Sequence, residues 1–84
     1  MPTICFLNGI MIIMHLTNKE HNPPYIHAIY GEYEATFYII EGELYEGGFP
    51  INEKKLVKKF VIKYSNELLE MWKTGNYYKL PPIN

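Results

Sequence analysis

Arginine and aspartate are both missing from this sequence, so its charges come from eight lysines and nine glutamates. Without arginine, bidentate hydrogen bonding of a guanidinium group to phosphate or guanine is excluded, which argues against sequence-specific nucleic-acid binding. The single cysteine, Cys5, excludes an internal disulfide and a cysteine-based zinc site, and its apolar neighbours predict a small core residue rather than a nucleophile. The apolar run at residues 10–14 is too short to cross a bilayer and follows no basic segment, so we expect a cytoplasmic protein without membrane association.

Apolar residues make up 48% of the 84 residues and aromatic residues 15%, which predicts one domain over residues 1–84 with a modest core filled largely by rings. Charge is divided along the chain. Residues 1–50 carry one lysine against six glutamates, whereas residues 51–84 carry seven lysines against three glutamates. Either the two halves face each other, or one face meets an oppositely charged partner.

The first strand pair is predicted by its turn. Asn8-Gly9 between β-forming residues favours a hairpin of residues 3–7 and 10–16, because both turn positions need positive φ. Both faces of this hairpin are apolar, so we expect it to be buried on both sides or covered by a partner. The two-residue turn would pair Leu7 with Ile10, Phe6 with Met11, Cys5 with Ile12 and Ile4 with Ile13.

A three-strand meander follows. Gly31-Glu32 predicts a type II′ hairpin of residues 25–30 and 33–40, paired from Tyr30–Tyr33 to Tyr25–Tyr38, and Glu41-Gly42 predicts a third turn that pairs Ile39 with Leu44. Alternation places the following residues in the core: Ile26, Ala28, Tyr30, Tyr33, Ala35, Phe37, Ile39 and Leu44. The other face carries Tyr25, His27, Ile29, Glu34, Thr36, Tyr38 and Tyr45.

One long C-terminal helix is predicted between Asn52, a good N-cap, and Gly75, a suitable terminating glycine. Its apolar residues recur at helical spacing on one side: Leu56, Val57, Phe60, Val61, Tyr64, Leu68, Met71 and Trp72. The fold class is therefore α+β, an antiparallel sheet of about five strands, a hairpin plus the meander, with this helix packed on one face.

The other side of this helix is basic but contains two apolar residues. Its residues are Lys55, Lys58, Lys59, Ile62, Lys63 and Leu69. Either Ile62 and Leu69 are scattered surface residues, which are common, or with the lysines they form a docking strip for a second chain. We take these six residues, together with Tyr38 and Tyr45, as candidate binding residues.

The segment His21-Asn22-Pro23-Pro24-Tyr25-Ile26-His27-Ala28 holds two of the three histidines, and its prolines stiffen the approach to a strand. Three roles are open for it: metal binding, acid–base catalysis and protein docking. His15, His21 and His27 match no standard zinc spacing, so we expect no metal and no cofactor. Catalysis would use His21, His27 and Tyr25, with lysines and tyrosines holding RNA, as in a small metal-free ribonuclease.

The segment from His21 to Ala28 is typical of one family. So are four other short segments: Met1-Pro2-Thr3-Ile4, Gly9-Ile10, Tyr30-Gly31 and Glu70-x-Trp72. Over residues 1–73 the chain resembles a widespread family of small bacterial proteins classed only as a domain of unknown function. Its members are typically encoded beside another small domain, and the pair looks like a type II toxin–antitoxin module with this family as the toxin. The family usually reads Pro-Pro-His-x-His, and Tyr25 stands here in place of the first of those histidines.

The resemblance implies a toxin component that inhibits growth and is neutralised by a small antitoxin-like protein encoded nearby. RNA is the ligand if the toxin is catalytic. The alternative is a non-enzymatic protein-binding or regulatory module, for which the histidines and tyrosines would form a docking surface. The residues leave open whether the protein is an enzyme.

Overall fold

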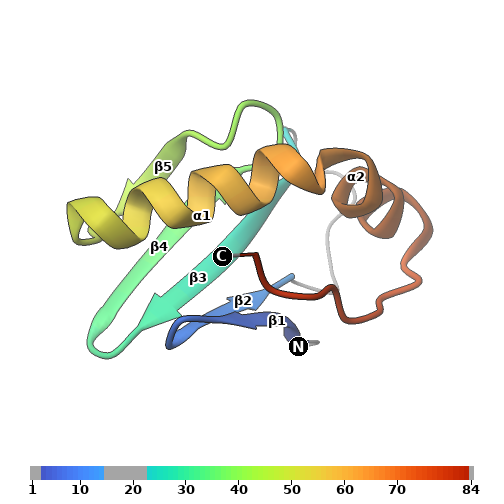
Figure 1. Cartoon of the computed structure of the whole chain (residues 1–84). Coiled ribbons are helices and arrows are strands. Elements are labelled where there is room, and N and C mark those ends of the chain that lie inside the picture. Colours follow the sequence, from blue (N-terminus) through green and yellow to red (C-terminus); the bar gives the residue numbers. More distant parts are fainter. Residues whose placement is uncertain (1–2, 15–22, 84) are drawn as a thin grey trace.

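The computed structural model describes residues 3–14 and 23–83, which form one sheet and two helices (Figure 1). The strands are β1 (Thr3–Leu7), β2 (Ile10–Ile13), β3 (Tyr25–Tyr30), β4 (Tyr33–Tyr38) and β5 (Leu44–Gly47), and the helices are α1 (Ile51–Lys63) and α2 (Ser65–Thr74). The strands are antiparallel in the order β1-β2-β3-β4-β5, so each pairs with the next along the chain. The predicted α+β class and the five-stranded antiparallel sheet are confirmed.

The β1–β2 hairpin turns at Asn8-Gly9, where φ is 49° and 81°, the positive values that a two-residue turn requires. The three pairs nearest the turn are confirmed, but Ile13 pairs with Thr3 rather than with Ile4. Ile4 is therefore the extra residue of a β-bulge. The bulge lets the consecutive residues Ile4 and Cys5 both enter the core, where they are 0% and 2% exposed.

The β3–β4 hairpin is paired as predicted, from Tyr30–Tyr33 beside the turn to Tyr25–Tyr38 at the other end. Gly31 has a positive φ of 59° and Glu32 does not, as a type II′ turn requires. Ile26, Ala28, Ala35 and Phe37 are buried as predicted, whereas Tyr33, beside the turn, is 43% exposed and its predicted place in the core is wrong.

The predicted register between β4 and β5 is wrong, because Leu44 pairs with Phe37 rather than with Ile39. The backbone N–H of Ile39 instead donates a 3.0 Å hydrogen bond to the carbonyl oxygen of Pro24, just before β3. Ile39 is fully buried, so it belongs to the core without belonging to the ladder. The ladder then skips Tyr45, which becomes the extra residue of a bulge in β5.

The predicted single helix is two helices, α1 and α2, which meet at Tyr64. Tyr64 has φ −109° and ψ 24°, outside helical geometry. Ser65-Asn66 follows, and these residue types compete for backbone hydrogen bonds and so favour helix boundaries. α1 begins directly after Pro50 rather than at Asn52, whereas the predicted end at Gly75 is confirmed by its φ of 77°.

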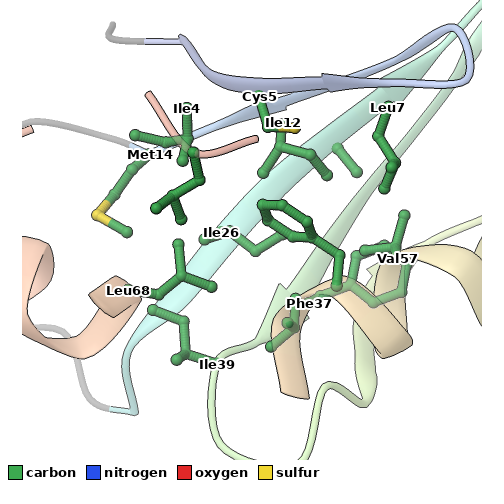
Figure 2. Packing of buried hydrophobic residues seen from close by; sticks show 14 of the residues in the cluster. Ile4, Cys5, Leu7, Ile12, Met14, Ile26, Phe37, Ile39, Val57 and Leu68 are labelled. Atoms are coloured by element: carbon green, nitrogen blue, oxygen red, sulfur yellow. The ribbon is translucent and has the colours of Figure 1, made fainter. Parts of the chain in front are cut away.

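The core lies between the sheet and the helices, and its side chains come from strands, both helices and the tail after α2 (Figure 2). Six of the eight residues predicted for the apolar side of the helical region are buried: Val57, Phe60, Val61, Leu68, Met71 and Trp72. The other two, Leu56 and Tyr64, are half-buried against the core. In Figure 1, α1 crosses one face of the sheet and α2 lies at the end of the sheet where β3 begins. Leu80, in the irregular tail, completes the core and is 8% exposed.

Candidate functional site

The face of the sheet opposite α1 carries the side chains that alternate away from the core, and we call it the outer face. Its residues are Phe6, Met11, His27, Ile29, Glu34, Thr36, Tyr38, Tyr45 and Glu46. Neighbouring strands place these side chains in rows, because directly paired residues of antiparallel strands point to the same side. The outer face therefore has an aromatic and aliphatic part and a polar part.

The polar part is a row that crosses three strands, formed by His27, Thr36 and Glu46 as successive partners, and the buried Ile13 is the partner of His27 on β2. The Thr36 Oγ1 and His27 Nδ1 atoms are 3.3 Å apart, which fixes the direction of the imidazole ring. Thr36 is 7% exposed and His27 is half-buried, so this hydrogen bond is partly shielded from water. The His27–Thr36 pair is a direct consequence of the predicted β3–β4 register, whereas Glu46 joins the row through the shifted β4–β5 register.

Beside this row the surface is hollowed by about 260 Å³. The hollow is lined by His27, Glu34, Ala35, Thr36, Glu46 and Gly47. Gly47, at φ 93°, lets β5 approach the backbone of β4 closely beside the hollow, because a Cβ there would meet the Glu34 carbonyl oxygen and lie 2.9 Å from the Ala35 Cα. An imidazole beside two exposed carboxylates and a hydroxyl can accept or donate a proton, but the carboxylates repel a phosphate.

The apolar part of the outer face begins with Phe6, Met11 and Ile29, which are neighbours across β1, β2 and β3. Phe6 is 58% exposed, so the hairpin is not buried on both sides within this chain, and of the two expectations the one that remains is cover of its outer side by a partner. At β4 and β5 the rings of Tyr38 and Tyr45 lie with centroids 4.9 Å apart, although the two residues are not paired in the ladder. Tyr45 reaches this position as the bulge residue and is 57% exposed.

Tyr25 pairs with Tyr38 as predicted, but its half-buried ring packs on Trp72 of α2, with centroids 5.0 Å apart. The residue thus ties the start of β3 to α2. His21, the other predicted catalytic residue, lies outside the described residues, as does His15. The structure places His27 and Tyr25 on one strand, and it brings His27 together with Thr36.

The basic residues predicted for docking lie on α1, on the other side of the sheet from the outer face (Figure 1). Lys58 Nζ donates a 2.8 Å hydrogen bond to Glu43 Oε2 in the β4–β5 turn, and this bond holds the pKa of Glu43 below its ordinary value. Ile62 is 54% exposed, whereas Leu69 is half-buried against the core. The helix break at Tyr64 separates the two, so they do not form the continuous strip that one helix predicts.

Sequence reasoning missed a groove between α1 and the C-terminal tail. It is lined by Lys59, Ile62, Lys63, Tyr64, Pro81, Pro82 and Ile83. The only sequence signal for it is the apolar Pro81-Pro82-Ile83 after the helical region, and no local rule says where a tail without regular structure will lie.

Several chemistries find no support in the part of the chain that the structure describes. No three histidine, cysteine or glutamate side chains of residues 3–14 and 23–83 gather closely enough to hold a metal ion. Burial raises the pKa of the Cys5 thiol, which makes it a poor nucleophile. Neither α1 nor α2 is long and apolar enough to cross a membrane.

Comparison with known proteins places the chain in a family rather than beside a characterised relative. The family model described as "Domain of unknown function (DUF4160)" matches residues 9–73. That span runs from the first turn to the last turn of α2, so it leaves out all of β1 and includes every outer-face residue except Phe6. No curated protein and no solved structure matches the chain.

Proposed function

We propose, from the premise that this chain belongs to the DUF4160 family, that it is the toxin-like half of a bacterial toxin–antitoxin pair. We assign binding of its small partner protein to the outer face of the sheet. The toxin role rests on the resemblance of its sequence signature, and the docking role rests on the open face. The observation that carries the docking role is the row of exposed or half-exposed apolar side chains on the neighbouring strands β1, β2 and β3, together with the Tyr38–Tyr45 ring pair on β4 and β5.

Exposed apolar residues that stand alone are ordinary on a protein surface, but neighbouring ones indicate an interaction site. Phe6 and Tyr45, more than half exposed, flank a sheet face that also carries Met11, Ile29 and Tyr38. Removing one such side chain from water contributes roughly 1.5–3 kcal/mol, so a few of them can dominate a binding energy. The strands hold these side chains rigidly, which limits the entropy lost on binding.

Growth assays test this proposal. Inducible expression in a bacterial host is expected to slow growth, and co-expression of the small protein encoded beside this gene is expected to restore it. A Phe6→Ser/Tyr45→Ser variant should still slow growth but escape the rescue, because its partner-binding face is damaged. Ile51→Ser is the matched control, since Ile51 is 63% exposed at the start of α1, away from the outer face.

The outcomes separate the parts of the proposal. Unimpaired growth at matched soluble expression removes the toxin role. If the neighbouring product nevertheless binds, the chain is a regulatory binding module, the alternative function. Full rescue of the double variant removes the outer face as the docking site.

A second candidate, acid–base cleavage of RNA at His27, is favoured by the Thr36 hydrogen bond and the adjacent hollow. The carboxylates of Glu34 and Glu46 oppose it, since they repel the phosphate backbone and the lysines of α1 lie on the other side of the sheet. Purified protein is expected to leave RNA intact. RNA turnover that is lost in His27→Ala and kept in Tyr25→His would instead establish catalysis and overturn docking as the sole role of this face.

A further inference from the structure

The groove on the helical side is a separate surface with its own chemistry. It measures about 540 Å³ and runs between the last turn of α1 and the tail. Most of the residues that form it are apolar: Ile62, Tyr64, Pro81, Pro82 and Ile83. Lys59 and Lys63 are its two charged residues. A concave, mostly apolar surface with a few polar groups at defined positions is the usual form of a binding site.

The tail wall of the groove is fixed in place. The backbone N–H of Leu80 donates a 2.8 Å hydrogen bond to the carbonyl oxygen of Ile4, and the Leu80 side chain is buried in the core. The next two residues are prolines, which lock their own φ angles and restrict the residue before each of them. A wall held in this way is already formed before a ligand arrives, so little conformational entropy is lost on binding.

Neither Lys59 nor Lys63 forms an ion pair within the described residues. Lys55, Lys59 and Lys63 recur every four positions along α1, and like charges at this spacing destabilise a helix. In residues 3–14 and 23–83 the ion pair that forms is Lys58–Glu43. Lys63 Nζ instead lies 5.7 Å from the centre of the Tyr64 ring. A ligand with carboxylates would relieve this repulsion and complement the positive charge of these lysines.

We propose that this groove docks a short acidic segment of a partner protein, with an aliphatic or aromatic side chain seated on Ile62 and Pro81-Pro82 and carboxylates paired with Lys59 and Lys63. A protein segment fits better than RNA, because the groove offers aliphatic carbon and one tyrosine rather than a series of rings on which bases could stack. The site is independent of the outer face, which lies across the sheet.

Fluorescence anisotropy and NMR test this assignment with the full chain. The probe is a short synthetic peptide of leucines flanked by glutamates. One control peptide replaces the glutamates with lysines, and a second replaces the leucines with serines. The acidic peptide is expected to bind and to shift the backbone amide signals of residues 59–64 and of Ile83. Its affinity should fall about tenfold or more in Ile62→Asp and several-fold in Lys63→Gln, and should weaken with added salt.

Lys73→Gln on α2 is the matched control and should bind like the parent, because Lys73 is exposed and does not line the groove. Circular dichroism establishes that each variant is folded. Equal binding of the basic peptide, or amide shifts confined to other residues, would overturn the proposal. Stronger binding of a short RNA than of the acidic peptide would overturn it in favour of a nucleic-acid surface, and concentration-dependent self-association that occupies residues 59–64 would assign the groove to a second copy of this chain.

Discussion

The backbone N–H of Leu80 lies 2.8 Å from the carbonyl oxygen of Ile4, so the end of the chain is tied to the β-bulge in its first strand. This contact closes the core, because Leu80 is 8% exposed and packs in the same cluster as Ile4. Leu80→Ala is expected to lower the free energy of unfolding by about 2 kcal/mol, near the low end for a leucine truncation since the site is at the margin of the core. Urea unfolding measures this, and Lys79→Ala, at an exposed neighbour, should leave the midpoint unchanged.

Phe60 belongs to α1, and its ring is fully buried in the core. Phe60→Ala should therefore cost roughly 3–5 kcal/mol, a large share of the stability of a domain of this size. Lys58→Ala, two residues earlier, should cost little because its ion pair with Glu43 is exposed. Comparable urea midpoints for the two variants would mean that α1 presents a different side to the sheet.

Gly47 and Gly48 are adjacent but face different surroundings. Gly47 has a φ of 93°, and a Cβ on it would collide with the backbone of β4. A Cβ on Gly48 meets nothing within 4 Å. Gly47→Ala is expected to cost about 1–3 kcal/mol and to displace β5 from β4, and Gly48→Ala to be close to neutral. Thermal melts give the stabilities, and hydrogen exchange of the β4 amides reports the displacement. Equal melting temperatures for the two variants would contradict the close approach.

The ion pair between Lys58 and Glu43 should make the attachment of the β4–β5 turn to α1 depend on pH. The hydrogen bond from Lys58, its positive charge and that of Lys54 lower the pKa of Glu43. A carboxyl whose pKa is lower in the folded state stabilises that state above its unfolded pKa, and this contribution is lost as the pH falls through the folded value. Glu43→Gln should therefore be slightly less stable than the parent at neutral pH and equally stable in acid. A stability difference that persists unchanged at low pH would assign the effect to another cause.

Much of the fold follows from local sequence rules. Asn8-Gly9 and Gly31-Glu32 set the registers beside them, because a two-residue turn leaves no freedom in which residues meet. The position of His27 on the outer face, paired with Thr36, follows directly from that second turn. The apolar spacing of the helical region also correctly identifies the buried side of α1 and α2.

The wrong β4–β5 register and the missed groove arise where a distant contact decides. Ile39 hydrogen-bonds to Pro24 rather than joining the β4–β5 ladder, which moves the register and creates the bulge at Tyr45. The break at Tyr64 moves Leu69 out of the predicted strip and against the core, and periodicity alone did not reveal it. The groove depends on where the tail returns, and Leu80 is placed by a bulge near the other end of the chain.

The central claim is that the outer face of the sheet binds a protein partner, and isothermal titration calorimetry with the protein encoded beside this gene tests it most directly. The parent chain and Ile51→Ser should bind with the same affinity, whereas Phe6→Ser/Tyr45→Ser should bind at least about tenfold more weakly, because two exposed anchors of the outer face are removed. Circular dichroism spectra that match the parent would establish that the double variant is folded. An unchanged affinity of the folded double variant, or no binding by the parent chain, would contradict the account.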